Sequence, residues 1–166
     1  MEVYYNKNLL KNNDFLKPIE TQKEPIVKLN VEPLKFYTLI MNDPDAVSGN
    51  YIHWTIINIS NNNIETGDII IPYKGPAPPP KSGIHRYNFE LYLQDGENND
   101  IKISQERSIE MNIFREKLSL SSPIFKINFL SKNESEYGGR KQKRKSKRKI
   151  TKKFRKTRRI KRLFHH

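Results

Sequence analysis

The distribution of charge along the 166-residue chain limits which part of it can form a folded core. Residues 140–166 hold 16 of the 31 Lys and Arg and no Asp or Glu, so residues 1–139 keep 15 basic against 18 acidic side chains. A segment so charged and so poor in apolar residues buries too little surface to offset its loss of chain entropy. We therefore expect one folded domain over residues 1–137 and a flexible, strongly basic tail over residues 138–166.

Apolar and β-branched residues gather in short runs that predict strands. The runs are residues 26–31, 36–41, 53–59, 86–93 and 125–129. Residues 36–41 and 53–59 are continuously apolar, which is typical of strands buried on both faces, whereas the others alternate. Ile109, Met111, Phe114 and Leu118 are spaced as on one face of a helix. The fold class is therefore predicted to be all-β with minor helices.

The composition also restricts the chemistry and the cellular setting. The chain has no Cys, which excludes disulfides and a thiol nucleophile. No apolar run approaches the roughly 20 residues that span a bilayer, and the N-terminus does not read as a signal peptide. We expect an intracellular protein, cytoplasmic or nuclear, that is a monomer.

The two histidines of the domain both stand where a loop meets a predicted strand. His53 follows the segment Asp43-Pro44-Asp45, and His85 follows a proline-rich run over residues 76–80. Imidazoles, a nearby tyrosine hydroxyl and carboxylates can together hydrogen-bond a phosphate or another small anion. The alternative is that Asp-Pro-Asp only forms a turn, that the histidines are structural, and that the prolines form a surface loop or a recognition site for another domain.

Four segments carry these residues in a recognisable order. They read YTLIMNDPDA (residues 37–46), HWTIINI (53–59), YKGPAPPP (73–80) and GIHRY (83–87). In this order and spacing the sequence resembles the phosphatidylethanolamine-binding protein family, which includes Raf-kinase inhibitor proteins, carboxypeptidase inhibitors and plant flowering regulators. The resemblance is firm over residues 36–93. Val47 stands where the family usually has a second proline.

The resemblance implies a β-sandwich around a large central, antiparallel-rich sheet with peripheral helices. It implies an anion-binding pocket for a small anionic ligand or phospholipid head group, formed by Asp43, His53, Pro78, His85 and Tyr87 and supported by Asp45, Arg86 and Trp54. In that site Asp43 would orient a histidine, and Arg86 would turn inward to brace the Asp-Pro-Asp loop. The implied function is a non-catalytic regulator or inhibitor of a partner protein, a kinase or a protease.

Two other kinds of site can be drawn from the same residues. Ser82, His85 and Asp43 could form a catalytic triad, but no nucleophile elbow surrounds the serine. His53, His85 and a carboxylate could hold a divalent metal, but their spacing matches no metal signature. The sequence therefore predicts no catalytic residue, no metal ligand set and no cofactor.

The tail predicts a second function class. Its dense positive charge suits nucleic acid, bound through phosphates, or an anionic membrane surface. Residues 140–145 also read as a nuclear-import signal, and Ile150, Phe154, Ile160 and Phe164 would share one side of a helix. A tail that serves only solubility is the remaining alternative. The alternative function is thus a nucleic-acid-associated protein in which the β domain is a scaffold.

Overall fold

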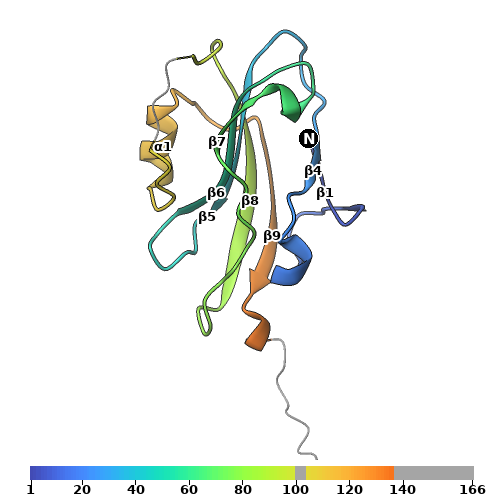
Figure 1. Cartoon of the computed structure of the whole chain (residues 1–166), viewed down its shortest axis with the longest axis vertical. Coiled ribbons are helices and arrows are strands. Elements are labelled where there is room, and N and C mark those ends of the chain that lie inside the picture. The colour runs from blue at the N-terminus through green and yellow to red at the C-terminus, as the bar shows by residue number, and fades with distance from the viewer. Residues whose placement is uncertain (100–103, 137–166) are drawn as a thin grey trace, which may run out of the picture.

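The computed structural model of the chain describes residues 1–99 and 104–136 (Figure 1). The expected domain boundary at residue 137 and the basic tail over residues 138–166 lie outside the described residues. Within them, no helix is long and apolar enough to cross a membrane.

A six-stranded sheet forms the centre of the molecule. Its strands, in spatial order, are β3 (Asp14–Phe15), β9 (Phe125–Lys132), β8 (Ile84–Leu93), β5 (Tyr37–Asp43), β6 (Tyr51–Ile59) and β7 (Asp68–Ile71). β3 runs parallel to β9, and every other neighbouring pair is antiparallel. A second sheet consists of β2 (Asn8–Leu9), β1 (Glu2–Tyr5) and β4 (Ile26–Lys28). The predicted two-sheet, antiparallel-rich β architecture is confirmed.

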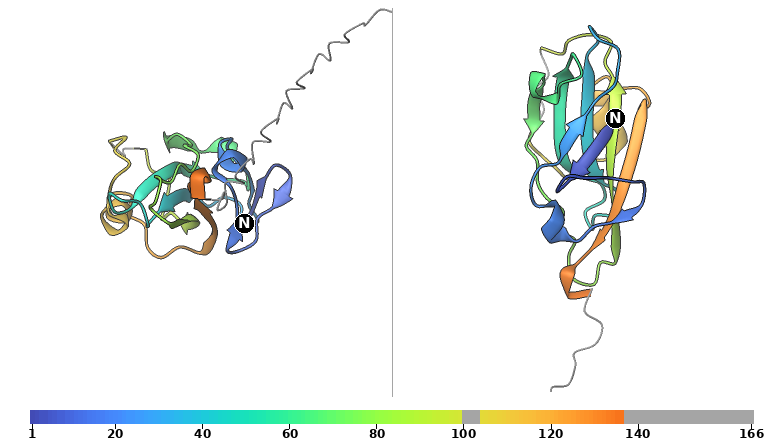
Figure 2. Two further views of the ribbon diagram at one scale, coloured as in Figure 1. Left: turned by 90° about the horizontal axis from the view of Figure 1, so that it is seen from below. Right: turned by 90° about the vertical axis from the view of Figure 1, so that its right-hand side faces the viewer.

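The two faces of the central sheet are covered differently (Figures 1 and 2). The small sheet covers one face, where Leu39, Trp54 and Phe89 lie in the larger hydrophobic core. Helix α1 (Met111–Lys117) covers part of the other face, where Phe114 packs in a second core with Ile40. Because both faces are covered, β5 is buried along its whole length and β6 along all but its first residue, as their continuous apolar runs predict.

The short elements were not predicted from the sequence. β1, β2, β3 and β7 are two to four residues long, too short for a periodic signal. The predicted strand over residues 26–31 is only Ile26–Lys28, because Leu29 to Val31 leave the sheet. The described residues also form three single-turn 3₁₀ helices, η1 (Pro18–Thr21), η2 (Ile64–Thr66) and η3 (Glu134–Glu136).

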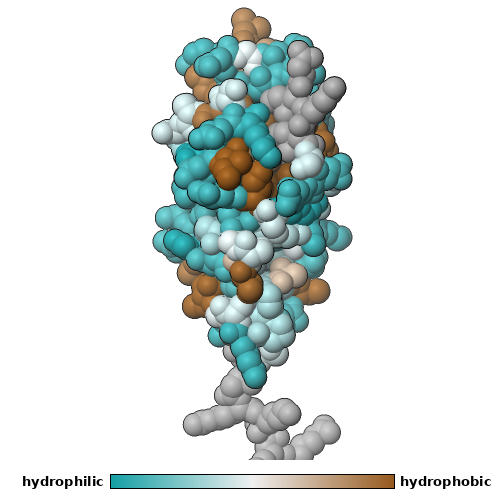
Figure 3. All heavy atoms as spheres, turned by 90° about the vertical axis from the view of Figure 1, so that its left-hand side faces the viewer, coloured by the Kyte–Doolittle hydropathy of each residue, from teal (hydrophilic) through white to brown (hydrophobic). Residues whose placement is uncertain are grey.

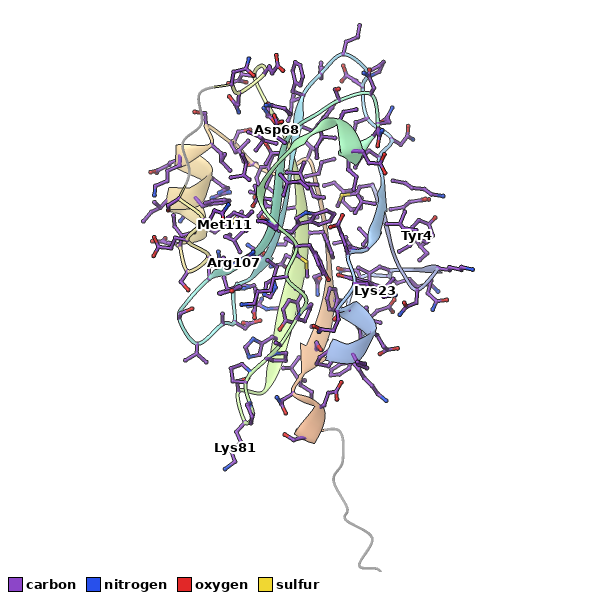
Figure 4. All side chains as sticks on the ribbon, viewed as in Figure 1. Tyr4, Lys23, Asp68, Lys81, Arg107 and Met111 are labelled. Carbon is purple, nitrogen blue, oxygen red and sulfur yellow. The ribbon has the colours of Figure 1, made fainter. Side chains whose placement is uncertain are left out.

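Two loops and η3 lie together at one end of the central sheet (Figure 1). The β5–β6 loop follows Asp43, and the longer β7–β8 loop carries the prolines, with Lys81 at its tip (Figure 4). Pro76 and Pro78 are buried, so this run packs as a wall rather than offering a free recognition motif. The Asn133 side chain donates to the Pro78 carbonyl oxygen at 2.8 Å and ties the end of β9 to the wall.

Candidate functional site

A pocket of about 400 Å³ opens between the β5–β6 and β7–β8 loops. The five residues predicted to bind a ligand all line it: Asp43, His53, Pro78, His85 and Tyr87. Its other lining residues are Ala46, Val47, Ser48, Tyr51, Lys74, Gly75, Ala77 and Pro79. The pocket thus has a polar floor from three strands and a mostly apolar wall from the two loops.

Asp43 and His85 form a buried pair at the floor of the pocket. The Asp43 Oδ2 lies 2.7 Å from the His85 Nδ1, and the two side chains are 5% and 1% exposed. The Asp45 backbone N–H donates to the other Asp43 oxygen at 2.9 Å. Burial raises the pKa of the Asp43 carboxyl, and the hydrogen bond with His85 offsets only part of this effect. The expected orientation of a histidine by Asp43 is therefore present, and that histidine is His85.

The hydroxyl of Ser82 fixes how many protons the pair holds. It donates its one hydrogen to the Pro79 carbonyl oxygen at 2.7 Å, and its oxygen lies 2.8 Å from the His85 Nε2. His85 must therefore donate to Ser82, while a second proton lies between His85 and Asp43. Whether this proton is on nitrogen or on oxygen, the pair has no net charge. The same geometry leaves the Ser82 hydroxyl bound to a carbonyl rather than poised as a nucleophile.

His53 is held in a different protonation state. Its Nδ1 lies 2.6 Å from the Lys74 carbonyl oxygen, to which only an N–H can donate. Burial above all, together with the positive charges of Arg107 and Lys74, lowers the pKa of His53 from 6.5 to about 4, and the hydrogen bond to the Lys74 carbonyl oxygen offsets only part of this effect. At neutral pH the ring is therefore neutral, with a lone pair on Nε2. His53 can accept a hydrogen bond in the pocket but cannot donate one.

Lys74 brings a positive charge to the pocket. Its Nζ donates to the Tyr51 hydroxyl at 2.8 Å and lies 5.3 Å from the centre of the Tyr51 ring. The Tyr51 ring in turn lies 5.0 Å from the His53 ring, and Tyr87 packs edge-on against His53 at 5.2 Å. Because the Lys74 side chain is exposed, it can move toward an anion without breaking a buried contact.

The three supporting residues lie around the pocket rather than in it. Arg86 braces the Asp-Pro-Asp loop through two hydrogen bonds of 2.8 Å to the Asp45 carboxylate, which lower the pKa of Asp45. The expectation that Arg86 turns inward is wrong, because its side chain is 57% exposed and reaches the loop from outside. Trp54 is fully buried beneath the site and packs at 87° against the Tyr73 ring.

Sequence reasoning missed Lys74, Tyr51 and Arg107. Arg107 donates to the carbonyl oxygens of Ile52, His53 and Pro72 and so clamps the polar segment before α1 onto β6. The segment has no periodic pattern that could have revealed this role. Lys74 stands beside Gly75 in the segment YKGPAPPP (residues 73–80), and this position was the only sequence signal for its place in the pocket. Among residues 1–99 and 104–136, no group of three His, Asp or Glu side chains could hold a metal ion.

Comparison with known proteins identifies relatives over most of the chain. The family model described as phosphatidylethanolamine-binding protein matches residues 10–124. Protein FLOWERING LOCUS T of Arabidopsis thaliana is 31% identical over 148 residues, which cover 84% of this chain and 83% of that protein. Protein BROTHER of FT and TFL 1, from the same plant, is 32% identical over 146 residues, 81% of each chain.

Solved structures show the same fold at lower identity. A carboxypeptidase Y inhibitor complexed with its cognate proteinase has a TM-score of 0.67 at 18% identity, over 80% of this chain and 82% of that chain. The phosphatidylethanolamine-binding protein from Plasmodium vivax has a TM-score of 0.62 at 18% identity, over 79% and 84%. The family match, the plant relatives and the shared fold agree, and the chain belongs to the phosphatidylethanolamine-binding protein family.

Proposed function

We propose that this protein is a non-catalytic binding protein whose pocket takes a small phosphate-bearing ligand, such as a phospholipid head group. The observation that carries the proposal is the set of charges around the pocket. A pair without net charge, Asp43 with His85, lies beside a neutral His53 and the cationic Lys74. A lone buried carboxylate would repel an anion, whereas here the Asp43 charge is compensated by the shared proton.

The protonation of His53 narrows the ligand class. Its Nε2 accepts and does not donate, so the ligand must present a hydrogen-bond donor at that point. A singly protonated phosphate has such a donor in its P–OH group, and phosphorylethanolamine has a second one in its ammonium group. The apolar wall of Val47, Ala77 and Pro79 suits a ligand whose phosphate carries an organic substituent.

The hydrogen bonding of Ser82 supports a non-catalytic role. A serine nucleophile gives its proton to a histidine base, but the Ser82 proton goes to Pro79. We propose that the protein instead regulates a partner protein, a kinase or a protease. This rests on analogy with the neighbour that is an inhibitor complexed with a proteinase, together with the exposed Val47 and Pro79 at the mouth of the pocket.

Calorimetric titration of the full chain with phosphorylethanolamine tests the pocket. His85→Gln and Asp43→Asn should each abolish the pocket's share of the binding heat, because each breaks the compensated pair. The matched control is Asp95→Asn, which removes an exposed carboxyl in the turn after β8. All variants keep the basic tail, so its own attraction for phosphate is common to them.

Lys74→Met keeps the proposal testable if the buried-pair variants fail to fold. It removes an exposed cation without leaving a buried charge, and it should weaken phosphorylethanolamine binding about tenfold. Binding that is unchanged in Lys74→Met and in folded His85→Gln would contradict the proposal.

A second candidate function belongs to the basic tail. We propose that residues 138–166 attach the protein to a polyanion, above all to nucleic acid. Residues 140–166 hold 16 Lys and Arg and no Asp or Glu. Binding of a DNA duplex, measured by fluorescence anisotropy, should weaken steeply with salt. Replacing the Lys and Arg of residues 140–149 by Gln should flatten this dependence, whereas Lys74→Met should not. Equal salt dependence in both variants would contradict this role.

A further inference from the structure

A second hollow, of about 540 Å³, lies on the opposite face of the central sheet from the pocket. Strand β8 alternates between the two: His85 and Tyr87 line the pocket, whereas Arg86 and Asn88 line the hollow. Asparagines dominate its lining, and we name it the amide groove after Asn13, Asn42, Asn50, Asn88, Asn112 and Asn128. The groove is independent of the family pocket and of the ligand proposed for it.

Three of these asparagines form a row across neighbouring strands. Asn42 of β5 is paired with Asn88 of β8, and Asn88 is paired with Asn128 of β9. The Asn88 Nδ2 donates to the Asn42 Oδ1 at 3.0 Å, and the Asn128 Nδ2 donates to the Asn13 Oδ1, also at 3.0 Å. The amides thus hold one another in fixed orientations across the floor of the groove.

The row leaves hydrogen-bonding capacity on buried side chains. Asn42 and Asn88 are only 3% and 6% exposed. Within the described residues, nothing donates to the Oδ1 of Asn88 or of Asn128, and the Asn42 Nδ2 has only the Met111 sulfur at 3.3 Å. The Asn50 Oδ1, which also belongs to the lining, is buried without a hydrogen-bond partner among the described residues, and burying an amide group in this way is costly. A core strand facing a helix would ordinarily place apolar residues here, so this row is suited to a polar ligand.

The charged side chains that line the groove, apart from Glu110, are held in ion pairs. Arg86 is bound to the Asp45 carboxylate, and the Lys126 Nζ lies 2.7 Å from the Glu90 Oε1. An anion would have to break one of these pairs, and the remaining carboxylate of the lining, Glu110, is exposed and screened by solvent, so a neutral ligand fits the groove better than an ion. Amides both donate and accept, as hydroxyl groups do, and Met111 and Pro44 offer apolar contact to C–H groups.

We infer that the amide groove binds a neutral polyhydroxylated small molecule, of the size of a monosaccharide or disaccharide. Its hydroxyl groups would donate to the Oδ1 atoms of Asn88 and Asn128 and accept from the Asn42 Nδ2. The side of the molecule that carries α1 is mostly hydrophilic at its surface (Figure 3), so a polar solute can approach the groove from solvent. Met111 lies on the α1 side of the sheet, away from Tyr4 on the small sheet (Figure 4).

The test follows the side-chain amide signals of the full chain by ¹⁵N NMR during titration with glucose, galactose, mannose, trehalose and myo-inositol. At least one of these probes should shift the signals of Asn42, Asn88 and Asn128 in a saturable way. Asn88→Leu should lower the affinity for that probe about tenfold or more, since it removes a hydrogen-bond acceptor and a donor from the groove. Asn128→Leu, at a half-buried position, serves if Asn88→Leu fails to fold.

The matched control is Asn8→Leu, on the exposed strand β2 away from the groove. The proposal is overturned if none of the five probes shifts the groove amides, or if Asn8→Leu weakens the response as much as Asn88→Leu. It is also overturned if the shifts centre on His53 and His85. Inorganic phosphate should shift those histidines and leave the groove amides in place, which separates a failure of the groove from a failure of the pocket.

Discussion

His53 and Lys74 are hydrogen-bonded to each other twice. The Lys74 N–H donates to the His53 carbonyl oxygen at 2.9 Å, and the His53 Nδ1–H donates to the Lys74 carbonyl oxygen at 2.6 Å. The first bond holds the proline-bearing loop against β6, and the second fixes the orientation and tautomer of the imidazole. The loop that walls the pocket therefore also sets which nitrogen of His53 is available to a ligand.

The first prediction concerns the titration of His53. Because burial lowers its pKa to about 4, the His53 ring should remain neutral from pH 8 to pH 5 and take up a proton only near pH 4. A pH series of imidazole ¹³C and ¹H shifts measures this directly. A midpoint near 6.5 would show that the ring is solvated in solution and would contradict its burial in the pocket.

The same shift makes stability depend on pH. The pKa of His53 is lower in the folded than in the unfolded chain, so its contribution is complete above pH 6.5 and is lost as pH falls toward 4. The loss amounts to roughly 3 kcal/mol. The free energy of unfolding, measured with urea, should therefore fall more between pH 6.5 and pH 4 for the wild type than for His53→Gln. Parallel profiles for the two proteins would contradict the assignment.

Gly75 allows a close approach that a methyl group would prevent. A Cβ there would lie 2.9 Å from both the Gln22 Cα and the Thr21 carbonyl oxygen, which are backbone atoms with little freedom to move. Gly75→Ala should displace the pocket wall, destabilise the fold by about 1–3 kcal/mol and weaken phosphorylethanolamine binding. Gly96→Ala is the matched control, because a Cβ there meets nothing within 4 Å. Equal effects of the two substitutions on binding would refute this role of Gly75.

Lys74 and Lys81 are exposed cations of the same loop, but only Lys74 lines the pocket. Lys74→Met should lower the affinity for phosphorylethanolamine about tenfold and reduce its salt dependence, while Lys81→Met changes both little. Calorimetry at two salt concentrations checks this. The reverse order of effects would place the ligand at the loop tip and not in the pocket.

The two carboxylates of the Asp-Pro-Asp segment should differ in their contribution to stability. Asp43→Asn removes the carboxylate that shares a proton with the buried His85 and leaves a weaker amide hydrogen bond in its place, so it should destabilise the protein by about 1–3 kcal/mol. Asp45→Asn breaks an ion pair whose arginine is 57% exposed and should cost less than about 1 kcal/mol. Urea unfolding of both variants measures the difference. Similar losses would mean that the pair with His85 is not tightly held.

Much of the fold could be predicted because its central strands carry strong patterns. The apolar runs containing Leu39 and Ile56 matched β5 and β6, and the alternation from Tyr87 to Leu93 matched one face of β8. The other face of β8 carries Asn88 and Glu90, for which the alternation made no prediction and which are buried in the structure. A polar residue in an alternating strand does not reveal whether another element covers its face.

The candidate site was partly predictable for a related reason. Asp43 and His85 are 42 residues apart, but the resemblance to a family placed them together, and the structure joins them at 2.7 Å. The hydrogen bonds of His53 to the Lys74 backbone could not be predicted, since a backbone carbonyl has no sequence signal.

The most direct test of the pocket follows the imidazole ¹⁵N signals of the full chain at neutral pH during titration with phosphorylethanolamine. The free protein should show the His53 Nε2 without a proton, and the ligand should shift this signal toward that of a hydrogen-bonded nitrogen while the His85 signals move with it. A His53 Nε2 that is protonated in the free protein, or that stays in place as the ligand is added, would contradict the account.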